Sequence, residues 1–181
     1  IDAAVRSAEW LLPITLEAFA ADELVGRRMM HVGTSAEATA GVDPGLGEAP
    51  VPPVPPRGGF DVRLAGGSGE SLHRDLRNVD DEAVYRVLWQ LPESVKTLRV
   101  SWDVEALPSN GTLVLTDGAS GRFMEDIVLD ASGHAVLSGP VLGLGSVRIE
   151  RRADGGTTPL PQRVALIGNA PGTSAVSISS S

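Results

Sequence analysis

Histidine is the side chain most often used to bind metals or to move protons near neutral pH, and this sequence contains three: His31, His73 and His134. His31 and His73 fall in segments with strand-like alternation, whereas His134 falls in a turn. No His-x-His or His-x-x-x-His pair is present, and the absence of cysteine excludes thiolate ligands. We therefore expect no metal site and interpret the histidines as exposed or half-buried side chains.

Acidic residues could supply the acid–base chemistry of a glycosidase, for which two carboxylates must flank the same bond. The candidate pairs are Asp103 with Glu105 and Glu125 with Asp126. Asp103 and Glu105 continue the alternation of an expected strand, so we expect them on its solvated face, where acidic residues keep a sheet soluble. The Gly-x-Ser-x-Gly turn that presents a nucleophilic serine is also missing. We expect no catalytic residue and predict that the chain is not an enzyme.

Other segments have the composition of known binding loops without their spacing. Residues 80–82 (Asp-Asp-Glu) and the turn at Asp117 could offer oxygen ligands to calcium, but neither has the alternating Asp-x-Asp-x-Asp-Gly pattern of a specific calcium loop. The glycines at 66–69 and 143–145 do not open a helix after a buried strand, as a dinucleotide site requires. We therefore expect no cofactor.

Tryptophan side chains could form a platform on which sugar rings stack. The sequence has three of them, Trp10, Trp89 and Trp102, and each falls on the apolar phase of its segment. Side chains on that phase face the core of a sheet protein, so we expect all three to pack inside. A carbohydrate-binding module remains an alternative reading.

Composition excludes several classes of protein. The formal net charge of −8 opposes nonspecific binding to nucleic acid, which depends on basic surfaces. No apolar run is long enough to span a bilayer, so we expect membrane association only through a partner. Without cysteine the chain cannot be a disulfide scaffold. We recognise no signal peptide and, because the first residue is Ile1, expect a chain that was processed or cut from a longer one.

Strands must position these residues, because alternation with a period of two is the dominant pattern. It is clearest in residues 95–117, which predict a central hairpin with its turn at 108–111. Residues 10–33 predict another hairpin. Short strands separated by glycine-containing turns predict an all-β protein, an immunoglobulin-like or fibronectin-like β-sandwich.

The predicted domain organisation places a proline-rich linker between two β regions. The first region is a hairpin that we expect to end an upstream sheet or to be completed by a partner. The linker should be an extended polyproline II spacer. The four parts are residues 1–40 (hairpin), 41–59 (Pro/Gly-rich linker), 60–152 (β-sandwich) and 153–181 (linker and strand-like tail). The candidate partner contacts are the linker prolines Pro50, Pro52, Pro53, Pro55 and Pro56.

Residues 34–64 resemble the approach to a β-sandwich module that is common in secreted proteins of the Bacteroidota. Thr39, Gly41, Asp43 and the prolines of residues 50–56 carry this resemblance. The tail resembles the start of the C-terminal sorting domain that type IX secretion recognises, with Ala170 and Gly172 departing from that motif. The matching residues are Pro161, Leu166, Asn169, Pro171, Thr173 and Ile178. The resemblance implies an extracytoplasmic location: the periplasm, the outer-membrane surface or the medium.

These observations together predict a noncatalytic, extracytoplasmic structural or interaction module. It would serve as an accessory subunit of a larger surface or membrane-associated complex, with protein partners and no nucleic acid. The alternatives are the C-terminal accessory region of a secreted hydrolase and the carbohydrate-binding module considered above.

Overall fold

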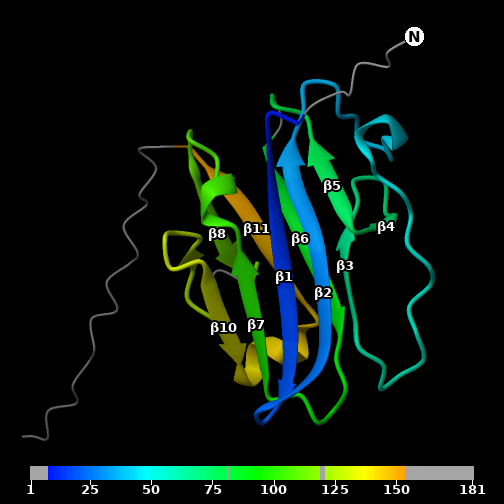
Figure 1. Cartoon of the computed structure of the whole chain (residues 1–181), viewed down its shortest axis with the longest axis vertical. Helices are drawn as coiled ribbons and strands as arrows, with labels where there is room; N and C mark the ends of the chain where they lie inside the picture. Colours follow the sequence, from blue (N-terminus) through cyan, green and yellow to red (C-terminus); the bar gives the residue numbers. More distant parts are fainter. Residues whose placement is uncertain (1–7, 81, 119–120, 154–181) are drawn as a thin grey trace, which may run out of the picture.

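The computed structural model describes residues 8–80, 82–118 and 121–153. The chain is mostly β and forms two sheets that pack against each other (Figure 1), which confirms the predicted all-β sandwich. Sheet A contains, in spatial order, β10 (His134–Ser138), β7 (Thr97–Trp102), β1 (Trp10–Ala20), β2 (Glu23–Thr34) and β5 (Arg74–Arg77). Sheet B contains β4 (Ser71–Leu72), β3 (Asp61–Ala65), β6 (Val84–Gln90), β11 (Ser146–Arg152), β8 (Thr112–Thr116) and β9 (Ile127–Val128).

Short 3-10 helices join some of these strands. They are η1 (Pro44–Leu46), η2 (Val104–Ala106) and η3 (Gly139–Leu144). Within the described ranges, no helix has the length and apolar character that crossing a bilayer requires.

The core lies between the sheets because alternate residues of each strand point inward. In β1 the inward residues Leu12, Ile14 and Leu16 are at most 1% exposed. They belong to one continuous apolar cluster with inward residues of sheet B, such as Val62 and Leu64. Such period-two burial is what a strand with one solvated face requires.

The tryptophans take part in this core, as predicted. Trp89 and Trp102 are 8% and 6% exposed, and their indole N–H groups donate to the backbone oxygens of Leu142 and Asp130. Trp10 is half-buried and meets the ring of Tyr85 edge-on, with 6.1 Å between ring centroids. The indole rings are therefore not arranged as an exposed platform for sugars.

The N-terminal hairpin forms as predicted, but it is not a separate region. β1 and β2 pair antiparallel, with Leu16 opposite Arg28, and β1 also pairs with β7, with Leu16 opposite Val100. The hairpin is therefore the centre of sheet A and shares its core with the later strands. The expected division at residue 40 differs from the structure because alternation identifies a strand but not its neighbour.

The predicted hairpin over residues 95–117 is wrong. β7 belongs to sheet A and β8 to sheet B, so the segment between them crosses from one sheet to the other. Both strands do bury the expected apolar residues, but they bury them from opposite sides of the core. Residues 71–77 likewise contribute to both sheets, because the chain is divided at His73 into β4 of sheet B and β5 of sheet A.

The proline-rich segment lies along the sandwich rather than between separate domains. We call residues 47–59 the strap. Pro50 forms a β-bridge with Leu72, and the Val51 N–H donates to the Ser71 oxygen at 2.8 Å. The carbonyl of Pro52 accepts from Arg63 at 3.0 Å. The side-chain amide of Gln90 donates to the carbonyls of Pro55, Pro56 and Gly59 at 2.9–3.2 Å. The predicted tail falls outside the described residues from position 154 onward.

Candidate functional site

The acidic pairs considered as acid–base candidates occupy capping and surface positions. β7 ends at Trp102, and the Asp103 carboxylate accepts a hydrogen bond from the Glu105 N–H at 3.0 Å, which caps η2. Their expected placement on a strand face is therefore wrong, although both side chains are exposed. Asp126 does not face Glu125 across a cleft but accepts a hydrogen bond from Arg152 at 2.8 Å.

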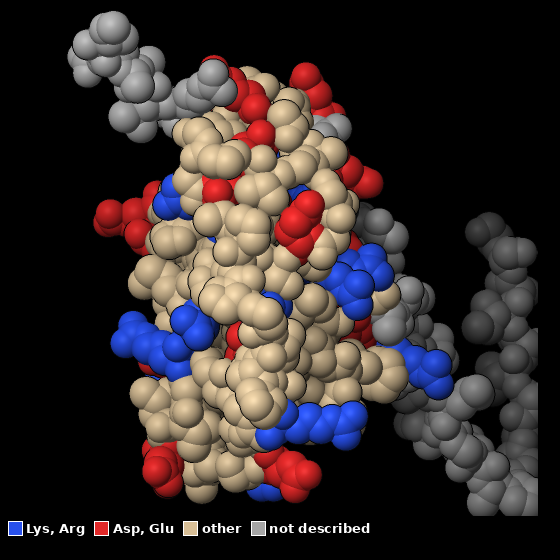
Figure 2. All heavy atoms as spheres, turned by 90° about the vertical axis from the view of Figure 1, so that its right-hand side faces the viewer, with Lys and Arg blue, Asp and Glu red and all other residues tan. Residues whose placement is uncertain are grey.

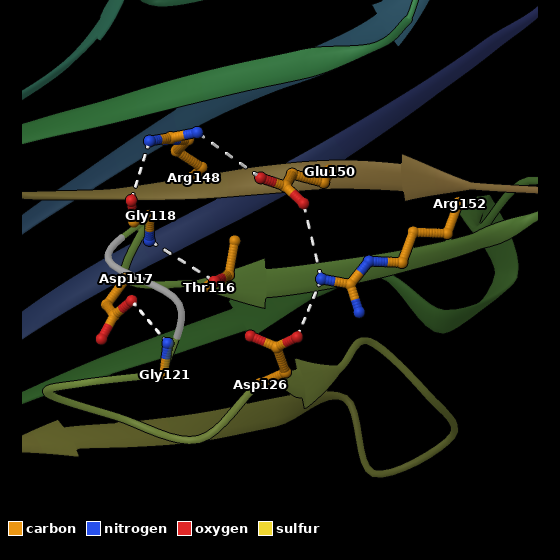
Figure 3. Close-up of polar contacts among 8 residues, drawn as sticks. All are labelled: Thr116, Asp117, Gly118, Gly121, Asp126, Arg148, Glu150 and Arg152. Carbon is orange, nitrogen blue, oxygen red and sulfur yellow. Dashed lines mark hydrogen bonds and ion pairs between the residues drawn. The ribbon is translucent and has the colours of Figure 1, made fainter. Parts of the chain in front are cut away.

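Figure 3 shows that Asp126 ends a row of charged side chains along β11. Arg148 lies 3.8 Å from Glu150, Glu150 lies 3.4 Å from Arg152, and Arg152 lies 2.8 Å from Asp126. The charges alternate in sign, so each is balanced by its neighbour. Ion pairs at this degree of exposure contribute about 0–1 kcal/mol each. The row keeps the outer face of sheet B solvated.

The Asp117 turn, one of the two candidate calcium loops, is organised by hydrogen bonds to its own backbone. One carboxylate oxygen of Asp117 accepts from the Gly121 N–H at 3.2 Å (Figure 3). The other accepts from the N–H groups of Phe123 and Met124 at 2.7 and 3.2 Å. In the other candidate loop, Asp81 lies outside the described residues. Among the residues that are described, no group of three His, Asp or Glu side chains could hold a metal.

Two of the three histidines come together, which the sequence did not indicate. β2 and β5 pair in parallel with His31 opposite Arg74, and the His31 N–H donates to the His73 oxygen at 2.8 Å. These residues and the strap line a groove of about 430 Å³, which we call the strap groove. Its lining is His31, His73, Arg74 and the strap residues 47 and 49–52. His134 lies apart, with its ring Nδ1 3.0 Å from the Ser132 oxygen.

The electrostatics of the strap groove are set by burial and by nearby arginines. Partial burial lowers the pKa of His31, and the Arg74 guanidinium lowers it further. Burial also lowers the pKa of His73, and Arg28 and Arg63 add to this effect while Asp61 opposes it. Both sets of effects favour the neutral form of the rings.

The candidate partner prolines lie on the strap around this groove. Pro50, Pro52, Pro53 and Pro56 are exposed, whereas Pro55 is half-buried. Figure 2 views this side of the molecule, with basic groups mainly across the middle of the face and acidic groups gathered toward its ends. The rings face solvent, but several of the carbonyls are already bonded within the chain, as described above.

The chain covers two of its own sheet edges. The strap bridges β4 through Pro50. At the edge of β5, the outward-pointing Leu76 N–H donates to the carboxylate of Glu48 at 2.6 Å. Glu48 is only 2% exposed, so it closes this edge as a buried acceptor. Covered edges do not recruit another strand.

The opposite edge of sheet A, at β10, is open. The Trp102 N–H donates to the Gly133 oxygen at 2.9 Å, and the register continues with Ala135 opposite Val100. Antiparallel pairs alternate between bonded and non-bonded residues, so the backbone N–H and C=O of Val136 point away from β7. Within the described part of the chain, no residue bonds these two groups.

A shallow depression lies beside this open edge. Its volume is about 260 Å³, and its lining includes Phe19, Thr97, Arg99 and Val136. The Arg99 guanidinium lies 5.2 Å from the centre of the Phe19 ring. Val136 is 53% exposed, and β10 contains no Lys, Arg, Asp, Glu or Pro. Natural edge strands are usually protected by such residues, so β10 stands out as a surface for pairing.

Comparison of this chain with models of known protein families, with curated protein sequences and with solved structures gives no match. The arrangement of its own residues is therefore the basis for a functional assignment.

Proposed function

We propose that this chain is a noncatalytic interaction module that binds an extended segment of a protein partner along the edge of β10. The single observation that carries the proposal is the outward-pointing N–H and C=O of Val136 on an edge strand without charged residues or proline. An added strand would satisfy both groups, and main-chain hydrogen bonds of this kind supply affinity in β-strand addition.

The depression beside β10 gives such a segment a source of specificity. A strand added next to Val136 presents alternate side chains to the outer face of sheet A. An aliphatic side chain of the added strand, opposite Val136, would lie over the depression that Val136 and the Phe19 ring line. The Arg99 guanidinium lies over the same Phe19 ring. We therefore favour a partner segment that is extended and carries apolar residues at alternate positions.

The cellular setting of the proposal comes from the sequence. The resemblance of residues 34–64 and of the tail to secreted proteins supports an extracytoplasmic location, and with it the role of an accessory subunit in a surface or membrane-associated complex. Partner contact through the linker prolines is a separate hypothesis, and it concerns the side of the sandwich away from β10.

Site-specific photo-crosslinking separates the two contact surfaces. A photo-reactive amino acid is placed at Val136 or at Val54 in the full chain, in the cells that make the protein. The two positions are matched, since Val136 is 53% and Val54 is 51% exposed and Val54 lies on the strap. Mass spectrometry identifies any adduct.

We expect one defined protein adduct at Val136 and none at Val54. A Val136→Lys variant should abolish copurification of the same partner, because a charge at an edge position blocks strand pairing. An adduct at Val54 alone would transfer the contact to the proline segment. No defined adduct at Val136 would refute binding at the β10 edge.

A further inference from the structure

The strap groove gathers cationic and histidine side chains in a chain whose formal net charge is −8. Arg74 comes from β5, and His31 from the adjacent position on β2. The strap forms the opposite wall. It contains one acidic residue, Glu48, whose carboxylate accepts hydrogen bonds from the N–H groups of Asp43 and Leu76. The groove is therefore lined by hydrogen-bond donors without a carboxylate of its own.

Two of the arginines in this region have no anionic partner among the described residues. The Arg74 guanidinium donates to the Leu46 carbonyl at 3.1 Å and forms no ion pair. Arg28 also forms no ion pair, and its buried Nε has no hydrogen-bond partner. By contrast, Arg63 is neutralised by Asp61 at 2.6 Å. Arg28 is not among the residues that line the groove, so Arg74 is the lining residue whose charge an anion would balance.

We propose that the strap groove binds a small oxyanion, a phosphate or sulfate group, between the rings of His31 and His73 and the guanidinium of Arg74. Guanidinium groups bind such oxyanions through parallel N–H···O hydrogen bonds. The imidazole N–H groups are further donors, and they become stronger donors when the rings are protonated. The volume of about 430 Å³ also leaves room for a small organic group that carries the anion.

Proton uptake should accompany binding. The charged groups that act on the two rings are Arg28 on β2, Asp61 and Arg63 on β3, and Arg74 on β5. All but Asp61 disfavour imidazolium in the empty groove. A bound dianion offsets these cations and raises the histidine pKa values, so affinity must increase as the pH falls.

Isothermal titration calorimetry of the full chain with sodium sulfate, inorganic phosphate and glycerol phosphate tests the proposal. Sulfate is the main probe because its own charge does not change between about pH 5.5 and about pH 7.5, so any pH dependence belongs to the protein. The ionic strength is held constant, because salt screens exposed charges. Glycerol without phosphate controls for the organic part, and glycerol phosphate shows whether the oxyanion binds better as a substituent than as a free ion.

We expect saturable binding of one sulfate per chain with a dissociation constant of about 1 mM or lower at the acidic end of this range. The affinity should fall by up to about tenfold per pH unit for each linked proton as the pH rises. Arg74→Gln should weaken binding about tenfold or more, since charge-assisted hydrogen bonds are the strong ones. His73→Gln should remove a large part of the pH dependence.

Arg86→Gln is the matched control, because Arg86 is exposed on β6, has no ion pair among the described residues and does not line the groove. It should leave sulfate binding unchanged. Equal losses in Arg74→Gln and Arg86→Gln would show that sulfate responds only to overall charge, and the proposal would be wrong. Absence of saturable binding by the parent chain would also overturn it. Neither result bears on partner binding at β10, because the crosslinking experiment uses the opposite edge of sheet A.

Discussion

The buried carboxylate of Asp75 should make this protein more stable in mild acid than at neutral pH. Asp75 lies on β5 with its side chain 4% exposed, and its Oδ2 is 2.6 Å from the Arg77 guanidinium. Burial is the main reason why the pKa of Asp75 rises from 3.8 to about 6, and nearby Glu48 adds to it, whereas Arg77 opposes it. The folded chain therefore holds this proton more tightly than the unfolded chain.

The size of the effect follows from this difference in pKa. Between pH 3.8 and about 6 the folded state keeps the Asp75 proton and the unfolded state has lost it. The contribution of Asp75 to the free energy of unfolding must then decrease as the pH rises through this interval, and this contribution is largest below 3.8. The pKa difference, 6 − 3.8 = 2.2, corresponds to about 3 kcal/mol at 1.36 kcal/mol per pKa unit.

Urea unfolding of the parent chain and of Asp75→Asn across this interval measures the contribution. Asn does not titrate, so pH dependence that is present in the parent and absent from Asp75→Asn belongs to the Asp75 carboxyl. We expect the parent to lose about 2 kcal/mol more than Asp75→Asn between about pH 4 and about pH 7, because part of the full difference lies below pH 4. Asp80→Asn, at an exposed position, should leave the pH dependence of the parent unchanged. Identical pH dependence in the parent and Asp75→Asn would refute the reasoning.

Two substitutions test the packing of the sandwich. Gly26→Ala should lower the free energy of unfolding by about 1–3 kcal/mol, because a Cβ on Gly26 would meet the ring of Phe60. Gly143→Ala is the control: a Cβ there has free space, so the substitution should be nearly neutral. Equal effects of the two substitutions in urea unfolding would contradict this packing. Tyr85→Phe should cost about 1 kcal/mol, since it removes the hydrogen bond that the buried Tyr85 hydroxyl donates to the Gly33 oxygen at 2.6 Å. A melting temperature equal to that of the parent would be the contrary result.

Some of this architecture could be predicted because it depends on local patterns. The alternation from Leu12 to Ala18 and the polar turn after it identified β1 and its hairpin with β2. The apolar phase of Trp89 and Trp102 identified their burial. In each case the pattern within one strand is sufficient, because burial on one face of a sheet imposes a period of two.

The partners of these strands could not be predicted in the same way. β7 and β8 have the pattern expected of a hairpin, yet Asp103 caps η2 and the chain crosses to the other sheet. The strap groove depends on the parallel pairing of β2 with β5, which brings His31 beside His73. Nothing in the spacing of these histidines signals a pairing across such a long connection. The prolines predicted an extended strap, but the contacts that hold it come from side chains elsewhere in the fold.

The uneven protection of the sheet edges also limits the stoichiometry of assembly. Among the described strands, β4 and β5 are closed by the chain itself, and β9 offers only two residues at its edge. Residues 23–30 of β2 pair only with β1 in the part of the chain that the structure describes, but they include Glu23, Arg27 and Arg28, and charged side chains discourage strand pairing. A strand that joined β10 as proposed would therefore find no comparable uncharged edge on the same chain. Growth by edge pairing would end after one addition, either as a single partner segment or as a closed two-fold pair of chains. Strand addition at β10, as proposed, would thus give discrete complexes rather than open-ended fibres.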